Sequence, residues 1–213
     1  LYRAVKEELA DDGKAAPLDR CFVLREGTDI TLIGWGAVLQ EVLAVAARLA
    51  EDVAMLDVMS NGRVVLGIAI GYKPDEFALY GVVLEKRGAR FEEQLAIMKG
   101  LWTQESLTFK GTYYTVEGRL EPKPVAKPHP PLWIGGHSRA ALRRVAKLGD
   151  GWHPVGANPA VPLGPAELRA SLGELSKLTE AGGRDPRTLT ISYKAPLYDA
   201  GKPCGIEANA AKY

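Results

Sequence analysis

Four consecutive residues, Gly135-Gly136-His137-Ser138, carry the strongest chemical signal in this chain. Two adjacent glycines let a backbone approach a ligand closely, and Ser138 can cap a helix that we predict to begin at Arg139. The free amides and positive dipole end of such a helix attract a phosphate, to which the hydroxyl of Ser138 and the ring of His137 can donate hydrogen bonds. The residues alone fit a plain strand-to-helix turn with a serine cap equally well.

A second candidate lies at Gly71 and Tyr72, directly after the apolar run Val64 to Ile70. A run without polar alternation indicates a strand that is buried on both faces of a parallel sheet. Ligands of parallel α/β proteins sit beyond the carboxyl ends of such strands. We therefore expect Gly71 and Tyr72 to contact a ligand.

Two tryptophans at predicted strand ends, Trp35 and Trp152, are candidates for lining a substrate pocket, because an indole packs well against a flat ring. A place in the hydrophobic core is an equally good interpretation of each. No metal site is expected, since His129, His137 and His153 lack the helical i, i+4 spacing of zinc ligands. His129 stands among prolines and is predicted to be exposed. The residues identify no general base.

Helical and strand patterns alternate along most of the chain. This alternation predicts parallel βα units and therefore an α/β fold. The predicted helices span residues 40–56, 87–102, 139–148 and 166–181, the strands span 30–33, 64–70, 132–134, 152–155 and 189–193, and a small hairpin spans 107–116.

Composition excludes several classes of function. The 27 basic and 26 acidic residues give a formal charge of +1, and the basic residues are scattered, so nucleic acid is not an expected partner. No run approaches the roughly 20 apolar residues that span a bilayer, so no membrane partner is expected. The two cysteines stand far apart in the sequence, which favours a reduced, cytoplasmic protein.

Three separate stretches resemble the bacterial luciferase-like monooxygenase family. They read AEDVAMLDVMSNGRVVLGIAIGYKPDEFALYG, KRGARFEEQLAIMKGLW and PHPPLWIGGHSRAALRRVAKLGDGW, in the same order as in that family. The resemblance is best over residues 30–155 of what we take as a single domain, 1–213. It implies a TIM-type (β/α)8 barrel that binds FMN or the deazaflavin coenzyme F-420. It also implies that Gly136 to Ser138 hold the cofactor phosphate.

This chain departs from the family pattern in two ways. We expect five or six strands rather than eight, so the barrel looks incomplete in this chain. The active-site histidine that several relatives carry near their N-terminus has no counterpart that we can identify. Ala69 and Ile70 also stand where some relatives carry a cysteine and a basic residue, which argues against a luciferase-like aldehyde reaction.

The resemblance predicts a flavin- or deazaflavin-dependent oxidoreductase or monooxygenase that acts on a small organic substrate. A flavin reductase is a candidate partner. An open barrel would expose strand edges and core, so we expect a homodimer. The alternative is a non-catalytic flavin-binding or interaction protein on a truncated barrel.

Overall fold

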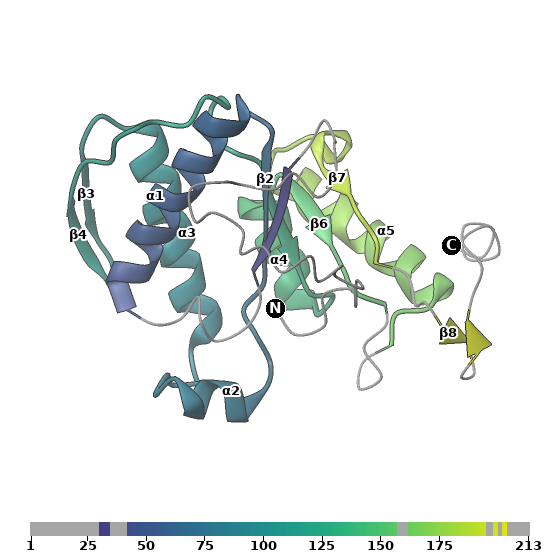
Figure 1. The fold of residues 1–213 in the computed structure, drawn as a ribbon. Helices are drawn as coiled ribbons and strands as arrows, with labels where there is room; N and C mark the ends of the chain where they lie inside the picture. The colour runs from purple at the N-terminus through teal and green to yellow at the C-terminus, as the bar shows by residue number, and fades with distance from the viewer. Residues whose placement is uncertain (1–29, 35–41, 157–161, 195–197, 200–201, 204–213) are drawn as a thin grey trace, which may run out of the picture.

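The sheet at the centre of the molecule is parallel, as predicted. The structure is a computed structural model that describes residues 30–34, 42–156, 162–194, 198–199 and 202–203, with side chains from 46 to 156 and from 162 to 194. Its five strands lie in the order β1-β2-β5-β6-β7 (Figure 1). They are β1 (Ile30–Gly34), β2 (Val64–Ile68), β5 (Leu132–Gly135), β6 (Gly151–His153) and β7 (Thr190–Ile191).

Helices connect successive strands of this sheet. They are α1 (Val42–Ser60), α2 (Pro74–Leu79), α3 (Arg87–Thr103), α4 (Arg139–Leu148) and α5 (Pro165–Ala181), with a short 3-10 turn at Pro186–Thr188. In Figure 1, α1 lies beside α3 and α4 beside α5. Contacts between α3 and α4 join the two pairs.

Two small antiparallel hairpins lie outside the sheet. The strands β3 (Leu107–Lys110) and β4 (Thr115–Gly118) form the predicted hairpin after α3. The strands β8 (Tyr198–Asp199) and β9 (Lys202–Pro203) form the other.

The hydrophobic core lies between the helices and one face of the sheet. Leu66, Ile68, Ile134 and Trp152 project into it and are at most 3% exposed. Phe91, Leu95, Met98 and Trp102 recur at helical spacing along α3 and form a stripe that is also at most 3% exposed. Burial of one such side chain contributes about 2 kcal/mol, so this stripe fixes α3 against α1 and the sheet.

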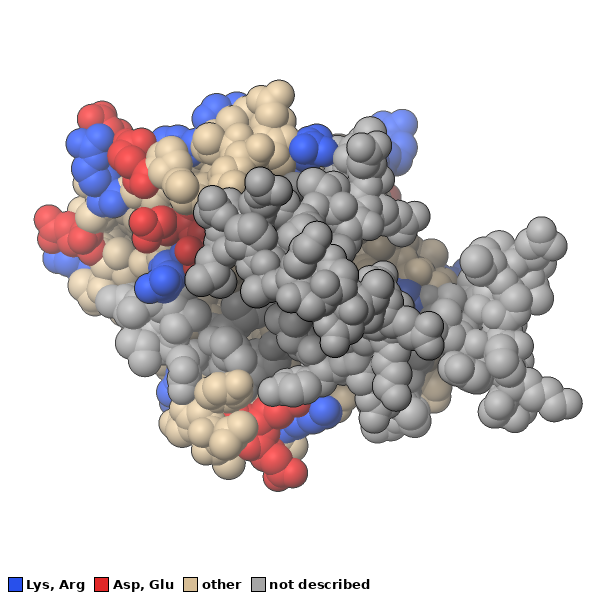
Figure 2. All heavy atoms as spheres, viewed as in Figure 1, with Lys and Arg blue, Asp and Glu red and all other residues tan. Residues whose placement is uncertain are grey.

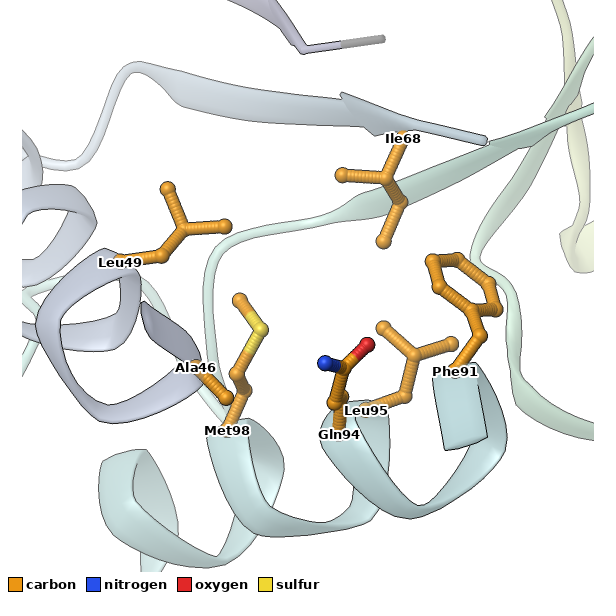
Figure 3. Close-up of a pocket in the computed structure, with 7 residues that line it drawn as sticks. All are labelled: Ala46, Leu49, Ile68, Phe91, Gln94, Leu95 and Met98. Atoms are coloured by element: carbon orange, nitrogen blue, oxygen red, sulfur yellow. The ribbon is translucent and has the colours of Figure 1, made fainter. Parts of the chain in front are cut away.

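The seam between α1, β2 and α3 is closely packed. Figure 3 shows the side chains of Ala46, Leu49, Ile68, Phe91, Gln94, Leu95 and Met98 converging there. They enclose a cavity of about 10 Å³, which is at the lower limit for one water molecule. The buried amide of Gln94 donates to the Tyr114 hydroxyl at 3.2 Å. The seam is therefore part of the core and too small for an organic ligand.

Helix α1 continues four residues beyond its predicted end. The Ser60 hydroxyl donates to the Asp57 carbonyl at 3.2 Å, and the Asp57 carboxylate accepts from the Ala126 amide at 2.8 Å. Asn61 and Gly62 then adopt φ of 56° and 78°, which turns the chain into β2. These bonds fix the last turn of α1, which apolar periodicity did not reveal.

The prediction that His129 is exposed is wrong. Its side chain is 8% exposed, and its Nδ1 atom lies 3.9 Å from a carboxylate oxygen of Asp150. The ring also lies against Trp102, with 5.9 Å between ring centroids. The proline-rich connector thus lies across the end of α3 instead of looping into solvent.

Charged side chains are mixed on the visible surface. In Figure 2, acidic and basic side chains lie among one another over the described part of this face, and neither sign forms a continuous patch. Among the helices that the structure describes, none has both the length and the apolar character needed to cross a membrane.

Two cations cover the C-terminal end of α4. The Arg184 guanidinium donates to the carbonyls of Ala146 at 2.8 Å and Gly149 at 2.9 Å, and the Lys99 ammonium donates to the Leu148 carbonyl at 2.7 Å. Both positive charges face the negative end of the helix dipole. They hold in place the helix whose other end carries the candidate phosphate loop.

We predict that Arg184→Ala lowers the free energy of unfolding by about 2 kcal/mol, because two carbonyls lose a charged donor. Urea denaturation measures this change. Arg187→Ala is the matched control, since Arg187 pairs with the exposed Asp185 and such pairs contribute little. Equal midpoints for the two variants would contradict this role of Arg184.

Candidate functional site

The parallel register aligns residues from four strands into two rows on the face of the sheet opposite the helices. Gly67 pairs with Trp133, Trp133 with Gly151, and Gly151 with Thr190. We call these four residues the lower row. Two positions further along each strand lie Ala69, Gly135, His153 and Ser192, which we call the upper row; Gly135 pairs directly with His153.

The lower row has one large side chain between two glycines. A Cβ atom on Gly151 would lie 2.5 Å from Cδ1 of Trp133 and 2.8 Å from the carbonyl oxygen of Thr190. The indole therefore covers the backbone of β6, and any side chain at residue 151 would displace it. In a closed barrel this face points to the interior, so Trp133 forms a floor beneath the strand ends.

The upper row stands at the carboxyl ends of the strands. A Cβ atom on Gly135 would lie 3.1 Å from the Ala69 methyl carbon, so these two positions leave only a methyl group and bare backbone. His153 and Ser192 follow, and Nδ1 of His153 lies 3.0 Å from the Ser192 hydroxyl oxygen. Ala69 and Gly135 thus form a flat half of the row with almost no side-chain atoms, and His153 and Ser192 form a polar half.

Trp133 and Ser192 both contact the ring of His153 and hold it in place. Its ring is stacked on that of Trp133, with 6.4 Å between centroids and 26° between planes. Burial lowers the pKa of the His153 imidazole, a hydrogen bond with the backbone of Ser192 opposes this shift, and the positive charge of Lys194 reinforces it. The imidazole is therefore neutral at pH 7 and able both to donate and to accept a hydrogen bond.

The loop after β5 has the geometry of an anion site. Gly136 adopts φ +92°, a conformation that side chains disfavour, and a Cβ there would lie 3.2 Å from that of Ala141. The Ser138 hydroxyl accepts from the Ala141 amide at 3.2 Å, as the predicted cap of α4. Because this oxygen acts as the acceptor, its own hydrogen is directed elsewhere and can be donated to a ligand.

The donors at this helix end suit a phosphate. The amides of Arg139 and Ala140 belong to the first turn of α4, where a helix provides no internal acceptor. That turn contains no acidic residue, and the Arg139 side chain pairs with Glu174 at 3.1 Å. Nε2 of His137 is buried and has no hydrogen-bond partner among the described residues. Hydroxyl, amides and helix dipole therefore converge in a helix turn that itself contains no acidic residue, and the carboxylate of Glu174 is paired with Arg139.

Trp152 lies in the hydrophobic core and does not line a substrate pocket. The side chain is completely buried on the helix-covered face. Its indole N–H donates to the Gly136 carbonyl at 2.7 Å. Trp152 therefore positions the phosphate loop from behind, and it offers a substrate no surface.

Two further candidates, Gly71 and Tyr72, lie in the segment between β2 and α2. Gly71 adopts φ +72° three residues beyond the end of β2. Tyr72 is 62% exposed. Their contact with a ligand stays a prediction. Trp35 lies outside the described residues.

Sequence patterns missed two residues of these rows, Trp133 and Ser192, whereas His153 shared with Trp152 the two interpretations of pocket or core. LWIG and GWH place Trp133 and His153 on one face only if the two strands pair in the observed register. The sequence does not give that register. Within the described ranges, no three His, Cys, Asp or Glu side chains gather as a metal site.

Comparison with known proteins identifies one family for this chain. The family described as luciferase-like monooxygenase matches residues 35–211. The FMNH(2)-dependent dimethylsulfone monooxygenase of Pseudomonas putida is 33% identical over 116 residues, which are 53% of this chain and 32% of that protein.

Solved structures agree on the fold. A monooxygenase from Streptomyces bottropensis has a TM-score of 0.60 and 26% identity, over 73% of this chain and 47% of that one. The coenzyme F-420 dependent tetrahydromethanopterin reductase of Methanopyrus kandleri has a TM-score of 0.65 and 13% identity, over 78% and 49%. These matches confirm a TIM-type α/β barrel, of which the described strands form a part. The chain spans less than half the length of these relatives.

We predict that Gly151→Ala destabilises the protein by about 2 kcal/mol, because the new methyl group collides with Trp133 and with backbone. Gly173→Ala in α5 is the control: its Cβ meets no atom within 4 Å, and alanine is the better helix former. Urea denaturation followed by tryptophan fluorescence measures both. Destabilisation of similar size in the two variants would show that Trp133 does not need Gly151.

Proposed function

We propose that this chain, which belongs to the luciferase-like monooxygenase family, holds the cofactor of a flavin- or deazaflavin-dependent oxidoreductase acting on a small organic substrate. The observation that carries the proposal is the N-terminal end of α4. There the Ser138 hydroxyl, the first-turn amides and the left-handed Gly136 meet in a turn that contains no acidic residue.

We assign each residue of the loop a role in binding the cofactor. Gly136 brings backbone close to the ligand, because no side chain stands there. Ser138 caps the helix and donates its hydrogen to a phosphate oxygen, and the amides of Arg139 and Ala140 donate to others. His137 is the further donor predicted for this group. Gly135, Gly71 and Tyr72 then border the space beside the phosphate.

The cofactor is FMN or the deazaflavin coenzyme F-420. The name of the Pseudomonas putida relative supports FMN, and the name of the Methanopyrus kandleri reductase supports the deazaflavin. Bound FMN would supply electrons for oxygen chemistry, and the deazaflavin would supply hydride. This chain's own residues bind and orient the cofactor.

The predicted partners follow from this chemistry. A protein that uses reduced FMN needs a source of reductant, so a flavin reductase is the partner we propose for that case. Exposed apolar side chains on α1, Met55 at 45% and Met59 at 75%, support assembly into a homodimer. The two widely spaced cysteines support a cytoplasmic location.

Ser138 provides a sharp test, because the cap and the charge can be changed separately. Aspartate caps a helix as well as serine does, so Ser138→Asp keeps α4 intact while it repels a phosphate. We predict that S138D weakens FMN or F-420 binding by at least about 100-fold, as like charges in contact cost several kcal/mol. Fluorescence titration of the purified protein measures this affinity.

Two controls define the result. Ser138→Thr keeps both cap and hydroxyl and should bind the cofactor within about threefold of the parent. Riboflavin lacks the phosphate, so its affinity should be the same for S138D and the parent. Equal FMN affinity in S138D and S138T would contradict the phosphate site. Tight binding without turnover in the presence of reductant would favour the non-catalytic alternative.

A further inference from the structure

We propose that His153 contacts the ring system of the bound cofactor and makes ring binding dependent on pH. This inference rests on the proposed function, because it assumes that a flavin or deazaflavin is held at the loop after β5. It adds a residue that the phosphate site does not contain and assigns it a task apart from phosphate binding.

The position of His153 is the first argument. The residue pairs with Gly135 in the sheet, and Gly135 directly precedes the phosphate loop. The neighbouring residue Trp152 ties β6 to that loop through its bond with the Gly136 carbonyl at 2.7 Å. A cofactor whose phosphate lies at the end of β5 therefore has the end of β6 as its immediate neighbour.

The shape of the upper row is the second argument. Ala69 and Gly135 leave a flat surface, since a single added Cβ on Gly135 would come within 3.1 Å of the Ala69 methyl carbon. A planar ring needs such a surface. Of the four residues in the row, His153 alone is ionisable, and it borders the bare half directly. It is thus the side chain placed to meet polar atoms on the edge of a ring.

Preorganisation is the third argument. The stacking on Trp133 and the 3.0 Å contact of Nδ1 with the Ser192 hydroxyl fix the plane and the rotation of the imidazole. Gly151 makes room for the indole beneath it. A surface histidine has no need for such support, whereas a ligand contact gains affinity from it.

The protonation of His153 gives a readout independent of turnover. Among the described residues, Trp133 from β5, Ser192 after β7 and the cation Lys194 face it, and burial, reinforced by the charge of Lys194, lowers its pKa. A bound neutral ring removes more water from the imidazole and so favours its neutral form further. Affinity for the ring is therefore constant near neutral pH and falls on acidification, as the imidazole of the unbound protein takes up a proton.

The experiment titrates the parent protein with riboflavin from pH 5 to pH 8, since riboflavin has no phosphate and its ring stays neutral over this range. If F-420 is the cofactor, the deazaflavin riboside is used at pH 8 only, because its ring hydroxyl itself titrates at lower pH. We expect His153→Gln to weaken binding about fivefold at pH 8 and to abolish the fall in acid. Ser192→Ala keeps the imidazole but frees its rotation, and we expect a loss of about twofold with the fall in acid retained.

The outcomes separate this inference from the proposed function. His137→Gln is the matched control, since it removes the other histidine near the loop and should leave the pH profile of riboflavin unchanged. If S138D loses FMN while H153Q binds riboflavin like the parent at every pH, the phosphate site stands and the role of His153 is refuted. If the parent binds no flavin or deazaflavin, the proposed function itself fails. If H153Q does not fold, Ser192→Ala still tests whether the orientation of the imidazole contributes to ring binding.

Discussion

The parallel register of β5 against β6 is the constraint on which the candidate site depends. It sets Trp133 beside Gly151 and Gly135 beside His153, so one glycine makes room for the indole and the other leaves open the surface beside the imidazole. A shift of the register by one residue would turn either Trp133 or His153 into the helix-covered core. The buried residues Ile134 and Trp152 on the opposite face prevent that shift, because one of them would then face outward. The core therefore specifies the site.

The same core also holds the phosphate loop. Trp152 is buried among the helices, yet its N–H reaches the Gly136 carbonyl, and Arg184 and Lys99 cover the far end of α4. The helix is thus fixed at both ends, and its free amides point to one place. A loop that is rigid before binding loses little entropy when a ligand arrives.

Much of this arrangement could be predicted from the sequence. Apolar periodicity located α3 and its stripe, and Ser138 with the glycines before it located the start of α4. What could not be predicted depends on contacts between distant residues. Trp152 and Trp133 look alike as aromatic residues in short strands, and only the register decides which one is buried under helices. His129 was expected in solvent because prolines surround it, but Trp102 and Asp150, both remote in sequence, cover it.

The most direct test of the account is a crystal structure of the protein with FMN or coenzyme F-420 bound. The account predicts phosphate oxygens within hydrogen-bond distance of the Ser138 hydroxyl and of the amides of Arg139 and Ala140. A phosphate bound at another part of the barrel, with these three donors facing only water, would contradict it.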